Sequence, residues 1–121
     1  MDIAISNSSA KPIYTQIFDQ ISSQIIKVEL PAEYALPPIR TMAKELKVSV
    51  ITVKKAWEEL ERLGLIYTVV GRGCFVAGLT SFEIEEKRSS LVDSKMIKDV
   101  EYYKGLGLSL KEITQAAKKH Y

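Results

Sequence analysis

The most regular hydrophobic pattern in the first part of the chain is a stripe of apolar residues three or four positions apart. Its members are Ile13, Ile17, Ile21, Ile25 and Val28. This spacing keeps one face of an α-helix buried. Pro12 suits the start of such a helix, because the first turn has no partner for the missing N–H. We therefore predict a helix from Pro12 to Val28.

Two shorter helical patterns follow a proline-containing connection, which prevents a continuous helix. The first of them begins near Pro38 and ends before a tight turn at residues 47–48. The other runs from Ser49, a good N-cap residue, to about Leu63, where Gly64 ends it. The predicted inward positions are Ile39, Met42, Ala43 and Leu46, then Val53, Ala56, Trp57, Leu60 and Leu63.

Two short runs of β-branched and aromatic residues come next, at 66–70 and 74–77, separated by a glycine-containing connection. Such a pair predicts a β-hairpin. Residues 2–5 alternate between polar and apolar and are predicted to add a short strand to it. Two short helices joined by a tight turn form a helix-turn-helix. The predicted fold is therefore mainly α with a small β-hairpin (α+β), in the order of a winged helix.

The remaining residues predict two further helices. Each of them begins with the spacing of a capping box, at Thr80 with Glu83 and at Ser109 with Glu112. The glycine-containing residues 105–107 separate the two helical patterns. We predict two parts, a winged helix over 1–77 and a helical tail over 78–121. The tail's predicted dimerisation residues are Ile84, Leu91, Val92, Met96, Ile97, Val100, Tyr103, Leu110 and Ile113.

Composition narrows the classes of protein that fit. The chain is 46% hydrophobic and 26% charged, which is typical of a globular domain and neither disordered nor fibrous. No apolar run is long enough to span a bilayer and the N-terminus lacks a secretory signal, so we expect a cytoplasmic protein without a membrane partner. The single cysteine, Cys74, and the single histidine, His120, favour neither a metal site nor a catalytic pair. We expect no enzyme, cofactor or metal.

The charge is more informative by region than in total. The net charge of the chain is only +2. From Arg40 to Lys55, however, five basic residues stand against one acid, Glu45, which gives a local net charge of +4. From Ala56 to Leu63 three acids stand against one base, a local net charge of −2. Positive charge is thus concentrated on the second helix and on the start of the third.

The start of the third helix is the part of a helix-turn-helix that enters the major groove of DNA. Hydroxyls there can contact phosphates or base edges, and lysines can contact phosphates. Val50 and Ile51 are either packing residues or contacts to thymine methyl groups. Arg72, between Gly71 and Gly73, is either a solvated charge or, as we favour, a contact to a phosphate or the minor groove. The remaining candidates are Arg40, Lys44, Ser49, Thr52, Lys54 and Lys55.

These residues resemble the winged-helix domain of the GntR family of bacterial transcription regulators. The matching motifs, in unbroken order, are Pro12-Ile13-Tyr14-x-Gln16-Ile17, Leu36-Pro37-x-x-Arg40-x-x-Ala43, Val48-Ser49-x-x-Thr52-Val53, Leu60-Glu61-x-x-Gly64-Leu65-Ile66 and Gly71-x-Gly73-x-Phe75-Val76. The resemblance implies a dimer, often a repressor, on a two-fold-related operator. It also implies DNA contacts from Arg40, Ser49, Thr52, Lys54 and residues 71–73.

The sequence departs from the family pattern at several positions. Pro38 replaces a serine that caps the second helix, and Val50 replaces an arginine that reads bases. Val28 stands at a common glycine, and residues 32–33 replace a Pro-Gly turn. Cys74 replaces a threonine, and a small strand residue is favoured over a redox switch because no resolving cysteine is near.

The short tail resembles the YtrA-type subfamily, whose two-helix tail dimerises and whose members commonly regulate transporter operons. Two such helices cannot enclose a ligand pocket of ordinary size by themselves, and a symmetric dimer is the commonest partner for their apolar residues. Tyr102 and Tyr103 either pack in the interface, as we favour, or line a small ligand cleft. The sequence gives no support for a small-molecule effector.

We therefore predict a homodimeric repressor of its own operon that binds double-stranded DNA, with the third helix in the major groove. The alternative is a winged helix used for protein–protein contact. The sequence leaves the operator, the regulated genes and the sign of regulation open.

Overall fold

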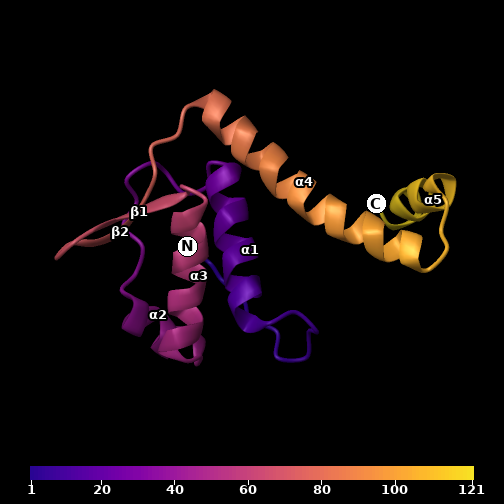
Figure 1. Cartoon of the computed structure of the whole chain (residues 1–121). Coiled ribbons are helices and arrows are strands. Elements are labelled where there is room, and N and C mark those ends of the chain that lie inside the picture. Colours follow the sequence, from indigo (N-terminus) through magenta and orange to yellow (C-terminus); the bar gives the residue numbers. More distant parts are fainter. The chain divides into compact units, whose positions relative to one another are not determined.

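The computed structural model describes all 121 residues and confirms the predicted fold class, with five helices and one two-stranded antiparallel hairpin. The chain divides into two compact units, Met1–Ile84 and Glu85–Tyr121. Figure 1 labels the elements along the chain. They are α1 (Ile13–Ile26), α2 (Ile39–Leu46), α3 (Val50–Arg62), β1 (Ile66–Val69), β2 (Gly73–Val76), α4 (Ser81–Gly105) and α5 (Leu110–His120).

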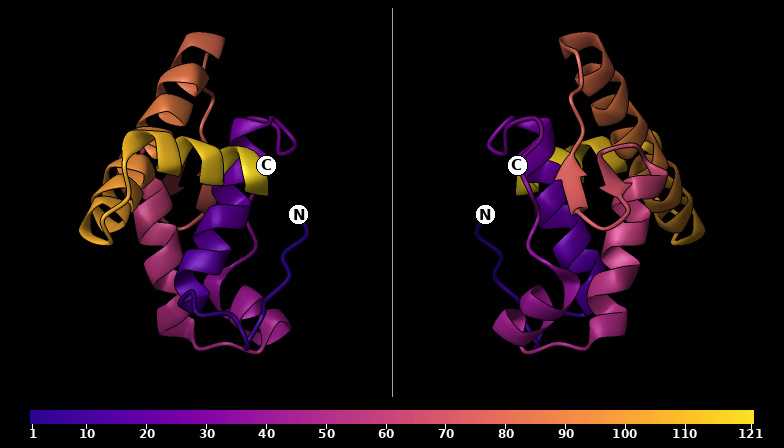
Figure 2. Two further views of the ribbon diagram at one scale, coloured as in Figure 1. Left: turned by 90° about the vertical axis from the view of Figure 1, so that its right-hand side faces the viewer. Right: turned by 90° about the vertical axis from the view of Figure 1, so that its left-hand side faces the viewer.

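The core of the first unit is built around α3. This helix packs against α1, α2 and β1, and Figure 2 shows α1 and α3 side by side in both views. Each apolar side chain of this size stabilises the fold by about 1.5–3 kcal/mol when it is fully buried. The side chains with essentially no exposed surface are Ile17, Ile21, Val53, Leu60, Leu65, Ile66 and Val76.

The hairpin pairs Ile66 with Val76 and Val69 with Gly73. It turns through Gly71 and Gly73, whose φ angles of +80° and +118° strain any residue with a Cβ atom. The segment before α2 lies along the outer edge of β2, where Ala35 and Phe75 form an isolated bridge. This segment, rather than the N-terminal one, lies beside the two-stranded sheet.

The predicted strand at residues 2–5 is wrong. The N-terminal segment has no regular secondary structure and instead follows α1, where glutamine side chains take the place of a neighbouring strand. The Gln20 amide accepts from the N–H of Ala4 at 2.9 Å and donates to its carbonyl at 2.7 Å. Gln16 bonds Ser6 in the same way, at 2.8 and 2.9 Å. The two glutamines are four residues apart, so they lie on one face of α1. Their partners Ala4 and Ser6 are two residues apart in the extended segment, which is a similar distance along the chain.

The predicted end of the first helix at Val28 is also wrong. Helix α1 ends at Ile26, and Val28 is 63% exposed in the left-handed region, with a φ of +58°. Glu33 has a similar φ of +69°. Both residues stand where the family commonly has glycine or a Pro-Gly turn, and the backbone keeps the conformation that glycine favours. A β-branched side chain is strained there.

The second unit contains most of α4 and all of α5, and neither helix has a buried residue. Both predicted capping boxes form. The N–H of Glu83 donates to the Thr80 hydroxyl at 3.1 Å, and Ser109 and Glu112 make the same reciprocal pair before α5. No helix is both long and apolar enough to cross a membrane.

We expect Val28→Gly to stabilise the first unit. The left-handed conformation costs a residue with a Cβ atom about 1–2 kcal/mol, and the extra freedom of glycine in the unfolded chain offsets about 0.5–1 kcal/mol of that relief. Urea unfolding followed by the fluorescence of Trp57 should show a free energy of unfolding that is higher by up to about 1.5 kcal/mol. The control variant Lys54→Gly lies within α3, where the backbone is right-handed, and its free energy of unfolding should be lower by about 1 kcal/mol. A lower free energy of unfolding in both variants would show that the left-handed conformation of Val28 does not strain the chain.

We expect Gln20→Met to release the N-terminal segment while leaving α1 folded. The substitution keeps the length of the side chain but removes both hydrogen bonds to Ala4, each contributing about 0.5–1.5 kcal/mol. Amide hydrogen exchange at Ala4 should accelerate by at least about tenfold. Gln115→Met on α5 should leave that exchange rate unchanged. Equal protection of Ala4 in both variants would show that the glutamine pairing does not hold the segment.

Candidate nucleic-acid interface

The first turn of α3 is capped and solvent-exposed. The Ser49 hydroxyl accepts a hydrogen bond from the N–H of Thr52 at 3.1 Å, and the two hydroxyl oxygens lie 2.8 Å apart. No acidic residue occupies this turn. The positive end of the helix dipole is therefore available to an anion such as a phosphate.

Helix α3 is fixed by its buried side, which determines what the other side presents. Val53 and Trp57 lie in the core, as the spacing predicts. Ile51, in contrast, is 78% exposed and Val50 is 36% exposed. Ile51 therefore does not pack inside its own chain, and its contact with a thymine methyl group stays a prediction.

The two neighbouring lysines of α3 have different surroundings. Lys54 is exposed. The ammonium of Lys55 lies 4.0 Å from the centre of the Tyr14 ring on α1, in a cation–π contact. Lys55 thus has a partner within the chain, which the sequence pattern did not reveal because Tyr14 is forty-one positions away.

Arg40 and Lys44 lie four residues apart on α2, so they share one face of that helix. Both are exposed, and neither takes part in any ion pair of the structure. Pro38, at the N-cap position of α2, makes no side-chain capping bond, as expected for the residue that replaces serine.

The wing tip presents one charged and one apolar side chain. Arg72 is exposed between the two glycines, and nothing lies within 4 Å of where a Cβ atom would stand at Gly71 or Gly73. Val70, at the same tip, is 95% exposed. Sequence reasoning did not single out Val70, because the residue continues the apolar pattern of β1.

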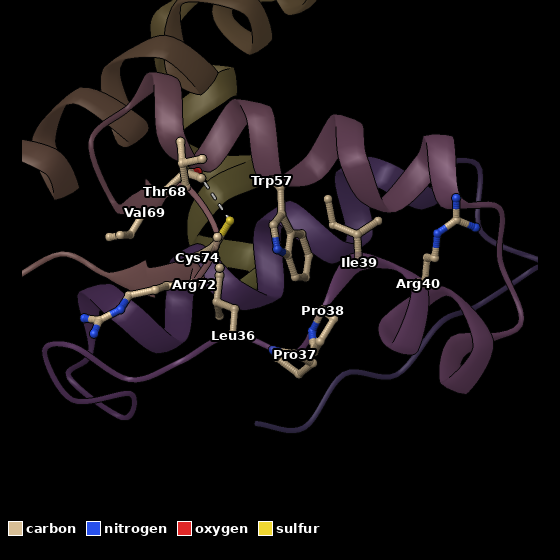
Figure 3. Close-up of a pocket in the computed structure, with 13 residues that line it drawn as sticks. Leu36, Pro37, Pro38, Ile39, Arg40, Trp57, Thr68, Val69, Arg72 and Cys74 are labelled. Carbon is tan, nitrogen blue, oxygen red and sulfur yellow. Dashed lines mark hydrogen bonds between the residues drawn. The ribbon is translucent and has the colours of Figure 1, made fainter.

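The wing and the start of α2 border a common groove of about 510 Å³. Figure 3 shows Arg40 and Arg72 at opposite ends of the row of side chains that line it. The groove therefore brings together two candidate DNA-binding residues that are thirty-two positions apart in the sequence. The lining between them is mainly apolar and includes Pro37, Pro38 and Trp57.

The three acidic residues of α3 lie towards its other end, and two of them have hydrogen-bond partners. Arg62 donates to the Glu59 carboxylate at 2.8 Å, and this hydrogen bond lowers the pKa of Glu59 below its usual value. Glu61 accepts a hydrogen bond from the Thr68 hydroxyl at 2.9 Å. Glu33 accepts one from the Tyr67 hydroxyl, which raises the pKa of that tyrosine. Negative charge is thus held away from the first turn of α3.

Comparison with known proteins agrees with this arrangement. Residues 13–76 match the model for bacterial regulatory proteins of the gntR family. The chain is 36% identical to the uncharacterised HTH-type transcriptional regulator YhcF of Bacillus subtilis, over 91% of this chain and 90% of that one. It is 35% identical to the HTH-type transcriptional repressor YtrA of the same organism, over 78% of this chain and 67% of that one.

A solved structure of the DNA-binding domain of AraR in complex with the operator ORR3 resembles this chain with a TM-score of 0.53 and 30% identity. The match covers 64% of this chain and 93% of that one. These relatives are named as transcription regulators, which confirms the prediction of a regulator rather than an enzyme. The chain belongs to the GntR family of bacterial transcription regulators and is of the YtrA type.

Proposed function

We propose that the protein is a homodimeric repressor that binds a two-fold-related operator with the start of α3 in the major groove. The observation that carries this proposal is the exposed, acid-free first turn of α3, together with unpaired basic residues on α2 and at the wing tip. A recognition helix in this family of folds uses its N-terminal residues to contact base edges. The similarity to the AraR domain, which was solved in complex with an operator, supports DNA binding by this fold.

Each group has a distinct role in this proposal. Arg40, Lys44 and Lys54 bind phosphates and set the position of the protein on the duplex. Ser49 and Thr52 contact phosphates or base edges, and Ile51 with Val50 contacts thymine methyl groups. The wing tip at residues 71–73, with Arg72, binds the flanking backbone or the minor groove. Lys55 is the candidate least available to contact DNA, because its ammonium already lies over the Tyr14 ring.

The tail joins two copies of the chain. None of its residues is buried within the chain, and Val92, Met96 and Ile97 are 53%, 54% and 62% exposed. Exposed apolar side chains that gather on one element are a common feature of protein interfaces. A second copy would bury it and would place two recognition helices about one helical turn, or about 34 Å, apart. The remaining members of the interface are Ile84, Leu91, Val100, Tyr103, Leu110 and Ile113.

Repression of the protein's own operon, with transporter genes among the targets, completes the proposal. It is supported by the similarity to YtrA, whose name describes it as a repressor. The rival function is a winged helix that binds another protein. The cluster of unpaired basic residues on α2, α3 and the wing argues against the rival.

Arg40→Ala and Lys54→Ala should each weaken binding to the promoter of the protein's own operon by about tenfold, because each removes a phosphate contact. Lys54→Ala should also reduce the slope of log K against log salt by about 1. Fluorescence anisotropy with a labelled promoter fragment at several salt concentrations measures both. Arg62→Ala, whose arginine pairs with Glu59 at the other end of α3, is the matched control.

Two results would contradict this assignment. Wild-type affinity in both variants would remove Arg40 and Lys54 from the interface. Loss of all complexes in the presence of excess non-specific DNA would favour the protein-binding rival.

The double variant Val92→Glu with Met96→Glu should be monomeric. Two unpaired carboxylates in an apolar interface cost several kcal/mol, so the dimer should weaken by at least about a hundredfold. Sedimentation velocity measures the oligomeric state and circular dichroism checks the helices. Lys98→Glu changes an exposed charged position of the same helix and should remain dimeric. An unchanged dimer in the double variant would exclude this face of α4.

A further inference from the structure

The groove between the wing and the start of α2 has the features of a small-molecule site. Its volume of about 510 Å³ lies within the range of about 300–1,000 Å³ that is usual for ligand sites. All of its lining residues belong to the first unit. The middle of the groove is formed by carbon-rich side chains, among them Leu36, Pro37, Pro38 and Ile39.

The charged groups at the groove are all of one sign. Arg40 and Arg72 lie at its two ends, and no acidic residue lines it (Figure 3). Neither arginine has an ion-pair partner in the structure. A ligand with a negative group would therefore meet a guanidinium at either end.

A buried hydrogen-bond donor also borders the groove. Trp57 is 3% exposed and lines the groove, and its indole appears in the middle of the row of side chains in Figure 3. None of the hydrogen bonds of the structure uses its indole N–H, and no fully enclosed polar atom lacks a partner. The N–H therefore keeps some accessible surface, and since Trp57 lines the groove, this donor is within the part of the molecule that a ligand there would contact. A buried donor normally has a partner, because leaving it unpaired is unfavourable.

We propose that this groove binds a small carboxylic acid with an apolar body. The body would lie on the proline and isoleucine side chains, and the carboxylate would accept from the indole N–H of Trp57 and from an arginine. A DNA phosphate can reach the arginines from outside, but its hydrophilic backbone does not match the apolar floor between them. The consequence for regulation rests on the proposed DNA binding: a ligand whose carboxylate occupies Arg40 or Arg72 competes with operator DNA for that arginine, and this competition lowers both affinities equally.

The test begins without DNA. Trp57 is the only tryptophan of the chain, so its fluorescence reports directly on the groove. Octanoate should change the emission saturably in the full-length protein, and calorimetry should give the same dissociation constant. Butyrate should bind at least about tenfold more weakly, because each methylene that leaves water contributes about 0.8 kcal/mol. Octanol and inorganic phosphate should each also bind at least about tenfold more weakly than octanoate, since each lacks one of the two required features.

The four arginines of the chain supply a matched pair of variants. The double variant Arg40→Gln with Arg72→Gln should weaken octanoate binding by at least about tenfold. The double variant Arg62→Gln with Arg88→Gln has the same net charge, removes arginines that pair with Glu59 and Glu85, and should bind octanoate like the wild type. Trp57→Phe, followed by calorimetry, should also weaken binding, because it removes the indole donor.

Several outcomes would overturn the proposal. No saturable response to octanoate would exclude an acid site, and equal binding of octanoate and phosphate would reduce the groove to a general anion surface. Equal loss in both arginine double variants would indicate an effect of net charge. None of these readouts involves DNA, so failure of the ligand site can be told apart from failure of the proposed DNA binding. If octanoate binds, its addition should lower operator affinity, and unchanged affinity would overturn the competition.

Discussion

The burial of one side of α3 is the constraint on which the rest of the first unit depends. Val53, Ala56, Trp57 and Leu60 are 0–3% exposed, and α1, α2 and β1 all pack against this helix. Because the inner side is fixed by packing, the residues between those positions must face outward. The exposure of Ile51 and Lys54 therefore follows from the burial of their neighbours. The same packing positions the wing and the start of α2 on the two borders of one groove.

Charge is separated along this helix. The N-terminal turn has a free dipole end and no acid, while the carboxylates of Glu59 and Glu61 are engaged by Arg62 and Thr68 at the other end. The net charge of +2 for the whole chain hides this separation. Electrostatic attraction to DNA depends on the local arrangement of charge, so a modest total is compatible with a basic binding surface.

The sequence predicted the elements whose signals are local. These signals are the apolar spacing in α1, α2 and α3, the capping residues of α4 and α5, and the glycines of the hairpin, and each acts within a few residues. All five predicted helices and the hairpin are present, although α1 ends at Ile26 rather than at Val28. The errors lie where distant residues decide. The segment at 2–5 alternates like a strand, but it meets glutamines of α1 rather than a sheet edge.

Other features could not be read from spacing for related reasons. Val28 fits the apolar repeat of α1, yet the helix ends before this residue. The positive φ of Val28 is indicated only by the glycine that the family commonly has at this position. The contact between Lys55 and Tyr14 joins two helices, and the groove joins the wing to α2. Such arrangements depend on tertiary packing, which the spacing of residues along the sequence does not reveal.

The central claim is that two copies of α3 read one operator. Hydroxyl-radical footprinting of the full-length protein on the promoter of its own operon tests it most directly, because it locates every protected sugar. Two copies of α3 on one operator should give two symmetric sets of protected positions, centred about one helical turn apart, with weaker protection at the flanks from the wings. Protection of a single half-site, or uniform protection without a preferred position, would contradict it.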